Sequence, residues 1–264
     1  MSFAPELADT ATGFDPTRFE DLYIKEDGHY WFEPRNRLIT ELILRFFPAC
    51  RRYLEIGCGT GFVLRGIRQV LPEANLVASE IHPSGLRHAR DRLAGSDTVQ
   101  FIQMDARDIP ACSAFDLVGA YDVIEHIEED ELVLKEFYRS LTSGGGVVVA
   151  VPQHPFLWSQ ADEVGHHKRR YRRGELEAKM RAVGFEILFS TSYTATLLPL
   201  MAASRLRRRG PEPLEAILKR EFDAPAWVNR LLRCILNIEV SLAIFGLKWP
   251  VGGSRVVVAR KPNH

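Results

Sequence analysis

A glycine-rich segment, residues 53–61, is the part of the sequence whose residue types point most directly to chemistry. It reads Tyr-Leu-Glu-Ile-Gly-Cys-Gly-Thr-Gly, an apolar run that passes into a turn and then into a helical pattern. Glycine permits positive φ and close approach of a ligand, and a helix N-terminus presents unpaired N–H groups. The segment predicts a polar ligand held largely by backbone. The candidate cofactor-binding residues here are Glu55, Gly57, Cys58, Gly59 and Gly61.

The spacing of the glycines discriminates between two cofactors. A dinucleotide fingerprint requires G-x-G-x-x-G, but counting from Gly57 places Phe62 where the third glycine belongs. Glu55 could accept hydrogen bonds from an ammonium group, whereas it would repel a pyrophosphate. The segment therefore favours a cationic ligand, and a nicotinamide-dependent oxidoreductase is the weaker alternative.

Short apolar runs alternate with helical patterns along most of the chain, which is typical of an α/β sheet with helical crossovers. Such crossovers make the strands mostly parallel and place helices on both faces. A triple glycine, 144–146, is expected to end the helix before the fifth strand. The expected strands are 53–56, 76–79, 100–104, 115–121, 147–151, 185–190 and 255–259, and the expected helices are 61–71, 83–94, 129–142 and 172–182.

Polar side chains stand where three further strands end. Glu80 ends the second strand and is followed by Ile81, Asp105-Ala106 ends the third, and Tyr121 ends the fourth. With these positions in register, residues 29–191 and the last strand resemble the class I S-adenosylmethionine-dependent methyltransferases. The resemblance implies S-adenosyl-L-methionine as cofactor, with its ribose on Glu80 and its adenine at Asp105 and Ala106. It also implies a Rossmann-like, seven-stranded, mostly parallel sheet whose last strand is antiparallel and preceded by a helical insertion.

The segment Tyr121-Asp-Val-Ile-Glu-His-Ile127 resembles the family's segment after the fourth strand, where Glu125-His126 recurs in many small-molecule methyltransferases. Asp122, Glu125 and His126 share one face at helical spacing, which is also metal-ligand spacing. Some quinone-ring and small-RNA methyltransferases of the class use a comparable set with a divalent ion, and His154 would be the supporting ligand here. A hydrogen-bonded loop anchor is the preferred interpretation, so no metal is expected. The catalytic candidates are His126, His154 and Tyr121.

The loop after the fifth strand supplies the expected acceptor side, because α/β sheets bind ligands beyond the carboxyl ends of their strands. Its substrate-binding candidates are His154, Trp158, His167, Arg170 and Tyr171. The run His166-His-Lys-Arg-Arg-Tyr171 resembles that of a bacterial methyltransferase subset of the type 11, 12 and 23 kind. That subset also has a segment like His29-Tyr-Trp-Phe-Glu-Pro-Arg35. By this resemblance Trp31 shields the sulfonium and Arg35 lies near the cofactor carboxylate. The alternatives are that Trp31 belongs to ordinary core packing and that the basic run is a solvated face.

The expected organisation is a leader and helical lid over 1–47 and a Rossmann-like domain over 48–264 with a helical insertion at 193–250. Residues 1–15 lack a signal-peptide pattern and are expected to be frayed. The insertion carries helix candidates at 195–205 and 227–247 and a basic turn at 207–209. The second helix is apolar, but its charged residues argue against a membrane span. Core packing, a dimer interface and peripheral membrane contact remain open for these helices.

Composition limits the partners. The 34 basic and 34 acidic residues balance, so no overall field favours nucleic acid. The four cysteines are widely separated, which suits a cytoplasmic protein without disulfides. The sequence predicts a methyltransferase acting on oxygen or nitrogen of a small-molecule, glycan-linked or lipid-linked acceptor, either cytoplasmic or peripheral to a membrane. The alternative is a cofactor-binding module without turnover that acts through a protein partner.

Overall fold

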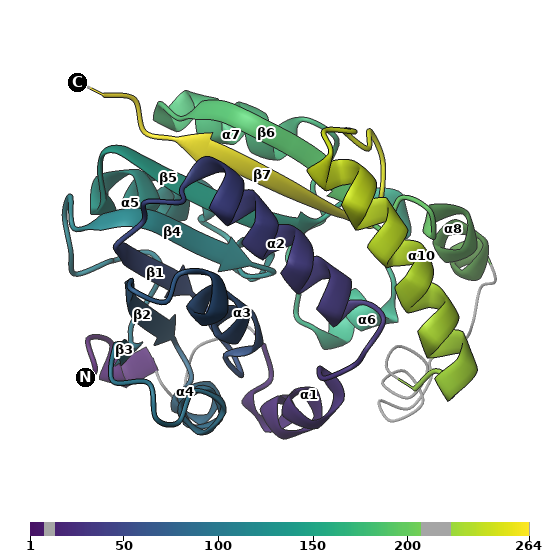
Figure 1. The fold of residues 1–264 in the computed structure, drawn as a ribbon, viewed down its shortest axis with the longest axis horizontal. Helices are drawn as coiled ribbons and strands as arrows, with labels where there is room; N and C mark the ends of the chain where they lie inside the picture. Colours follow the sequence, from purple (N-terminus) through teal and green to yellow (C-terminus); the bar gives the residue numbers. More distant parts are fainter. Residues whose placement is uncertain (8–13, 207–222, 264) are drawn as a thin grey trace.

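The computed structural model describes residues 1–7, 14–206 and 223–263. Its centre is a seven-stranded sheet of order β3-β2-β1-β4-β5-β7-β6 (Figure 1). The strands are β1 (Arg52–Ile56), β2 (Asn75–Glu80), β3 (Val99–Gln103), β4 (Phe115–Tyr121), β5 (Leu141–Pro152), β6 (Glu186–Tyr193) and β7 (Ser254–Arg260).

The strand directions confirm the predicted Rossmann-like sheet. The first five strands pair in parallel, while β7 runs antiparallel between β5 and β6. Strand order reverses between the neighbouring strands β1 and β4, because the chain returns to the centre of the sheet after β3. In open α/β sheets this is the place where ligands bind, beyond the carboxyl ends of the strands.

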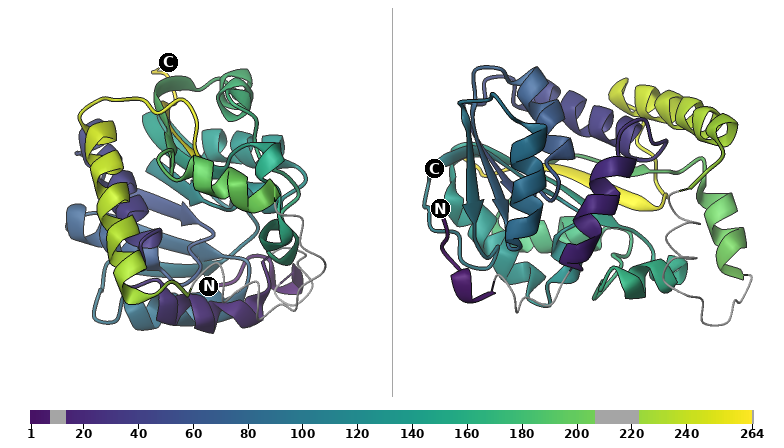
Figure 2. Two further views of the ribbon diagram at one scale, coloured as in Figure 1. Left: turned by 90° about the vertical axis from the view of Figure 1, so that its right-hand side faces the viewer. Right: turned by 90° about the horizontal axis from the view of Figure 1, so that it is seen from below.

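Helices cover both faces of the sheet (Figures 1 and 2). One face packs against α2 (Phe32–Phe46), α3 (Phe62–Val70), α4 (Pro83–Arg92) and α10 (Ala226–Ile244). The other packs against α5 (Asp130–Ser140) and α7 (Glu175–Val183). Each face thus has its own apolar core, and the buried strands between them are rich in valine, as β5 and β7 illustrate.

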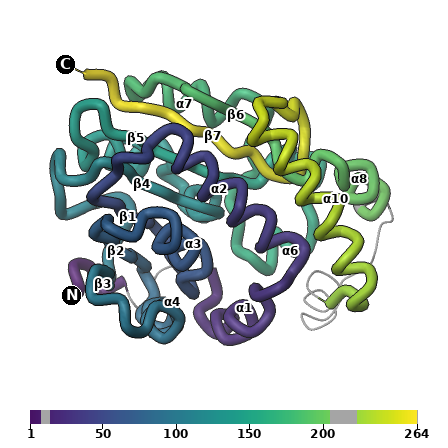
Figure 3. The backbone as a smooth tube through the Cα atoms, in the orientation of Figure 1, coloured from purple at the N-terminus to yellow at the C-terminus, as the bar shows by residue number. Residues whose placement is uncertain are grey.

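The expectation of a frayed leader is wrong for the first seven residues. The N-terminal segment lies beside β3 (Figure 3). Ser2 pairs with Gln103 at the edge of the sheet, and the Gln103 side chain donates to and accepts from the backbone of Ala4. A short 3-10 helix, Pro5–Leu7, follows, and another, Pro16–Arg18, leads into α1 (Phe19–Lys25). An unpaired sheet edge provides hydrogen-bonding groups that local sequence does not reveal.

The segment between β6 and β7 contains α8 (Leu198–Leu206) and α10, which lie at the same end of the molecule (Figure 2). α10 packs along α2, and Glu239 within it accepts hydrogen bonds from the backbone of Ala195 and Thr196. Among the described helices, none has both the length and the apolar character needed to cross a membrane. The basic turn Arg207–Arg209 lies outside the described residues.

Two local predictions need correction. Glycines 144–146 do not end a helix but lie within β5, where a Cβ on Gly146 would stand 2.1 Å from the Phe47 ring. The helix expected at 172–182 begins only at Glu175, because the preceding run is extended and pairs Tyr171 with Gln153 beside the sheet. A short helix α6 (Gln160–Val164), which starts in a capping box at Ser159, was not anticipated.

Candidate functional site

A cavity of about 1180 Å³ opens at the carboxyl ends of β1, β2 and β4, where the strand order reverses. Its volume exceeds the roughly 300–1,000 Å³ typical of a small-molecule pocket, so it has room for a cofactor and a second molecule. The expected cofactor-site residues that line it are Trp31, Arg35, Glu55, Gly57, Cys58, Gly59, Glu80, Ile81, Asp105, Ala106 and Tyr121. Gly61 is the exception: it caps α3 behind the wall.

The glycine turn has the backbone conformation that the sequence predicts. Gly57, Gly59 and Gly61 have φ values of 63°, 51° and 77°. A Cβ on Gly57 would clash with Val123 at 2.5 Å, and one on Gly61 would press on the Ala89 backbone at 3.0 Å. A Cβ on Gly59 would meet only the Phe19 ring, at 3.5 Å. Gly59 is therefore the turn residue whose missing side chain leaves space for a ligand.

Glu55 is a buried acid below this turn. The Tyr53 hydroxyl donates to its carboxylate at 3.3 Å and lies 3.2 Å from the Tyr121 hydroxyl. Burial raises the pKa of Glu55 to about 8, against the opposing effects of the Tyr53 hydrogen bond and the Arg35 charge. A carboxyl in this state is ready to accept a cationic ligand group, because a positive charge beside it restores the ionised form.

Glu80 at the end of β2 is held by backbone. Its carboxylate accepts hydrogen bonds from the N–H groups of Gly59, Ile81 and His82 at 3.1, 2.9 and 3.2 Å. Burial raises the pKa of Glu80, and these three bonds oppose the rise. These bonds tie the Glu80 carboxylate to the glycine turn and to the residues after β2, so the protein itself sets its position.

Asp105 lies two residues beyond β3 and is held by its neighbour Arg107. The guanidinium donates to Asp105 Oδ2 from Nε at 3.0 Å and from Nη2 at 2.8 Å. Asp105 Oδ1 accepts from the same Nε at 3.2 Å and from the Arg107 backbone N–H at 2.9 Å. Arg107 also reaches Glu129 at the start of the next helix. This pairing orients Asp105 and places Arg107 in the cavity wall, which the sequence did not predict.

The N-terminal helices α1 and α2 form part of the cavity wall. Arg35 is buried, forms an ion pair with Asp122 and stacks 4.7 Å from the centroid of the Trp31 ring. Glu26 at the end of α1 accepts a hydrogen bond from Thr60 in the glycine turn at 2.5 Å and pairs with Arg92 of α4. The face of Trp31 expected for a sulfonium is thus already in contact with Arg35.

The acceptor side brings together residues from the loops after β4 and β5. His126 and His167 both line the cavity, with ring centroids 4.7 Å apart. The fully buried Asp162 accepts from His167 Nδ1 at 2.9 Å and from Arg170 Nε at 2.7 Å. Although burial alone raises the pKa of Asp162, these partners lower it to about 2. Trp158 is also in the wall.

The expected helical face of Asp122, Glu125 and His126 is wrong. Residues 124–126 form a single 3-10 turn, and Asp122 precedes it with φ of 56°. Glu125 is fully buried, and neither of its carboxylate oxygens has a hydrogen-bond partner among the described residues. The hydrogen-bonded anchor preferred from the sequence is therefore wrong for Glu125. Glu125, His126 and His167 each offer an atom within 4.8 Å of the others, an arrangement that can hold a metal.

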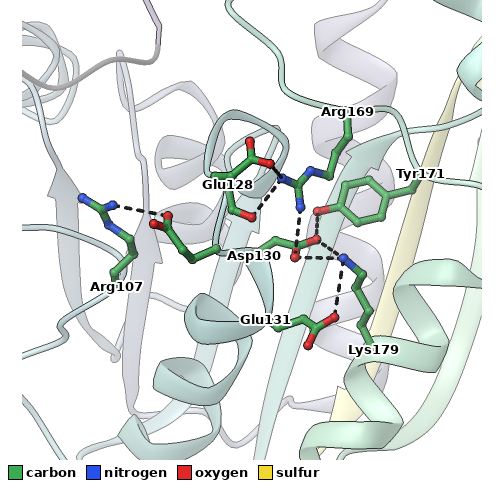
Figure 4. Close-up of polar contacts among 8 residues, drawn as sticks. Arg107, Glu128, Asp130, Glu131, Arg169, Tyr171 and Lys179 are labelled. Atoms are coloured by element: carbon green, nitrogen blue, oxygen red, sulfur yellow. Dashed lines mark hydrogen bonds and ion pairs between the residues drawn. The ribbon is translucent and has the colours of Figure 1, made fainter.

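Two predicted acceptor-side residues do not line the cavity. Tyr171 is fully buried beneath it, where its hydroxyl donates to Asp130 at 2.7 Å beside Lys179 and Arg169 (Figure 4). His154 has φ of 65°, and its ring lies 5.1 Å from the Phe156 ring and not in the cavity wall, so the expected metal ligand and base does not reach the site. Arg172 and Arg173, which follow the run 166–171, line a separate small pocket.

Several cavity residues were missed from the sequence. The N-terminal segment contributes Leu7, Phe14 and Arg18, and the segment before β7 contributes an apolar group of Leu197, Leu200, Met201 and Leu232. A signal was present for the second set, since these residues lie on the apolar sides of the two predicted helices. No local pattern marks the first set, because these positions depend on contacts with distant segments: Leu7 follows the residues that pair with β3, and Arg18 donates to the backbone of Val164.

Comparison with known proteins agrees with this geometry. Residues 54–149 match the family model described as a methyltransferase domain, a span that begins in β1 and ends in β5. This region contains the glycine turn and all three strand-end acids. The match favours a methyltransferase over a nicotinamide-dependent enzyme or a module without turnover.

Individual relatives extend the likeness beyond that domain. A Mycolicibacterium smegmatis protein described as a probable S-adenosylmethionine-dependent methyltransferase is 26% identical over 81% of this chain and 80% of its own. Two chloroplastic 2-methyl-6-phytyl-1,4-hydroquinone methyltransferases of Oryza sativa subsp. japonica are 31% and 32% identical over 40% and 52% of this chain. The chain spans only 32% and 38% of the lengths of these two relatives.

A solved structure shows the same fold. Haemonchus contortus phosphoethanolamine N-methyltransferase 2, in complex with S-adenosyl-L-methionine, aligns with a TM-score of 0.61 at 19% identity. The alignment covers 97% of this chain and 59% of that one.

Proposed function

Because the chain carries a class I S-adenosylmethionine-dependent methyltransferase domain, we propose that it transfers the methyl group of that cofactor to oxygen or nitrogen of a small-molecule, glycan-linked or lipid-linked acceptor. The observation that carries this proposal is the convergence of Glu55, Glu80 and Asp105, each from a different strand, around the open backbone of Gly59 in one cavity. Glu55 is buried and its pKa is raised to about 8, which suits a cofactor with positively charged groups, because a cation beside the carboxyl favours its ionised form.

Different residues of the chain would bind different parts of the cofactor. Glu55, with Arg35 nearby, would bind the amino-acid portion of the cofactor, whose ammonium and carboxylate they complement. Glu80 would accept the ribose hydroxyls, and Asp105 with the backbone of Ala106 would bind the adenine. When bound, the cofactor supplies an electrophilic methyl on a sulfonium. The contribution of the chain is to align that methyl with an acceptor and to exclude water, the main source of rate in a displacement of this kind.

The acceptor would enter beside His126 and His167, the two imidazoles in the cavity wall. Burial, followed by the His167 charge, lowers the pKa of His126 to about 3, so its ring is neutral and keeps an unshared electron pair. Arg170, which Asp162 orients, is available to an anionic group. The apolar residues of α8 and α10 would contact a nonpolar part of the acceptor.

The experiment that tests this proposal measures transfer of radiolabelled methyl from S-adenosyl-L-methionine to a panel of hydroxylated and aminated acceptors, some with alkyl tails. Asp105→Ala should bind the product S-adenosylhomocysteine at least about tenfold more weakly, and a matched exposed acid, Glu73→Ala, should bind it normally. Transfer to at least one acceptor class supports the proposal. Equal binding by Asp105→Ala and the native chain would contradict the cofactor site.

A further inference from the structure

The structure leaves Glu125 without the hydrogen bonds that a buried carboxylate needs. Its side chain is fully buried, and both oxygens lack partners among the residues that the structure describes. An unpaired buried charge is costly, and such groups in native structures generally bind a water, an ion or a metal. His126 also has a buried ring nitrogen, Nδ1, without a hydrogen-bond partner among the described residues. Two adjacent residues thus direct unused lone pairs into one small region.

A third side chain completes the group from another strand loop. His167 lies across from His126, and one atom from each of Glu125, His126 and His167 is within 4.8 Å of the other two. Two ligands of one ion, each about 2.0–2.2 Å from it, are at most roughly 4.4 Å apart. Rotamer-scale movements would therefore bring all three onto a single ion.

His167 is already oriented as a metal-binding histidine usually is, and His126 has a nitrogen free to bind. His167 holds Asp162 through Nδ1, at 2.9 Å, and this leaves Nε2 for coordination. The Nδ1 of His126 is buried and has no hydrogen-bond partner among the described residues, so this nitrogen is available for coordination. Histidines that bind metals typically donate their second nitrogen to a carboxylate or a carbonyl. Asp162 is itself fixed by Arg170 and by the Ser159 backbone N–H at 2.8 Å.

From these contacts we propose that Glu125, His126 and His167 form a binding site for one divalent transition-metal ion, with Asp162 as its positioning residue. Two imidazoles and one carboxylate favour Zn²⁺, Co²⁺ or Mn²⁺ over the all-oxygen ligands that Mg²⁺ and Ca²⁺ prefer. Because His126 and His167 line the cavity, the ion would face the acceptor and could bind its oxygen. This inference deepens the proposed function and assumes its acceptor side.

The test is titration of EDTA-treated full-length chain with Co²⁺, followed by visible absorption, and with Mn²⁺, followed by electron paramagnetic resonance. Mn²⁺ has little preference for thiolate, so binding of this ion separates the site from the exposed Cys112 and Cys234. The expected result is one ion per chain. Glu125→Gln and His167→Ala should each weaken binding at least about tenfold, and Asp162→Asn should weaken it by about 10–100-fold.

His166→Ala is the matched control, since His166 is the exposed neighbour in the same loop and is not part of the group. It should bind as the native chain does. The ion should also raise the Tm of the native chain but not that of Glu125→Gln, a readout that needs no acceptor. Absence of stoichiometric binding, or equal binding by all variants, would overturn the site.

Binding of S-adenosylhomocysteine, measured on the same samples, separates this inference from the proposed function. If the native chain binds S-adenosylhomocysteine but no ion, the metal site is wrong and the methyltransferase proposal stands. If it binds the ion but not S-adenosylhomocysteine, the failure lies with the cofactor site. Normal S-adenosylhomocysteine binding by Glu125→Gln and His167→Ala would also show that a lost ion does not reflect misfolding.

Discussion

Arg35 of α2 forms an ion pair with Asp122 at the end of β4, and the Arg35 side chain is only 5% exposed. This contact joins the N-terminal helices to the sheet at the cavity. It also explains why Asp122, a residue with positive φ, is held in place.

Arg35→Met should therefore destabilise the chain. Arg35 is only 5% exposed, so the variant loses a desolvated ion pair together with the contact on the Trp31 ring, and the expected loss in the free energy of unfolding is about 2 kcal/mol. Arg52→Met is the matched control, because Arg52 pairs with Asp116 while 50% exposed and should cost less than about 1 kcal/mol. Urea unfolding measures both. Equal losses would mean that the Arg35 pair is as weak as a surface contact.

Gly59→Ala tests the open face of the glycine turn. The added methyl would stand in the cavity at φ of 51°, so the variant should lose about 1 kcal/mol of stability and should bind S-adenosylhomocysteine roughly tenfold more weakly. Gly95→Ala is the control, since Gly95 has φ of 84° and open space around it. It should lose similar stability with no change in affinity. If both variants lowered the affinity for S-adenosylhomocysteine equally, Gly59 would not be part of the cofactor site.

The raised pKa of Glu55 predicts how the ligand-free chain responds to pH. The carboxyl has a pKa of about 8 in the folded chain and about 4.5 when exposed, so the folded state binds the proton more tightly. The stability from this group is complete below pH 4.5 and is lost as pH rises through 8. Thermal melts should show a Tm that falls between pH 6 and pH 9, with a smaller fall in Glu55→Gln. An identical pH dependence in the two chains would contradict the buried, protonated state.

The same acid predicts a proton release on binding. If the cofactor ammonium lies beside Glu55, binding favours the ionised carboxylate, and affinity for S-adenosylhomocysteine should rise up to tenfold between pH 6 and pH 7. Glu55→Gln should bind with little pH dependence over that range. Calorimetry in two buffers of different ionisation enthalpy would detect the released proton, and its absence would place the ammonium elsewhere.

Tyr171→Phe separates a structural role from a substrate role. Its hydroxyl donates to Asp130, which also binds Lys179 and Arg169, so its loss should cost about 2 kcal/mol of stability (Figure 4). Affinity for S-adenosylhomocysteine and methyl transfer should be unchanged in the folded variant, because the ring does not line the cavity. A rise in the KM for an acceptor without a loss of stability would instead mean that Tyr171 takes part in acceptor binding.

The predictions that the structure confirms depend on local pattern and on sheet rules. Apolar runs, glycines and strand-end acids are fixed by positions close in sequence, so the sheet and the placement of Glu55, Glu80 and Asp105 at its carboxyl edge follow from residue types. The meeting of His126 with His167 needs one more step, that β4 and β5 are neighbours whose loops emerge together. The succession of these two strands along the chain is evident from the sequence. The conformation of the loop after β5, which keeps His154 out of the cavity wall, is not.

Other features depend on contacts between distant segments. The pairing of Ser2 with Gln103 is set by an open sheet edge, and no periodicity in the first residues predicts it. The lack of partners for Glu125 is a property of packing from several loops, whereas the sequence showed only a carboxylate at a plausible spacing. Burial of this kind is decided by the three-dimensional arrangement and not by the order of residue types.

The most direct test of the central claim is calorimetric titration of the purified chain with S-adenosylhomocysteine, with NAD⁺ as the comparison ligand. The account predicts one site for S-adenosylhomocysteine and no measurable binding of NAD⁺. Binding of NAD⁺, or a folded chain that binds neither ligand, would contradict it.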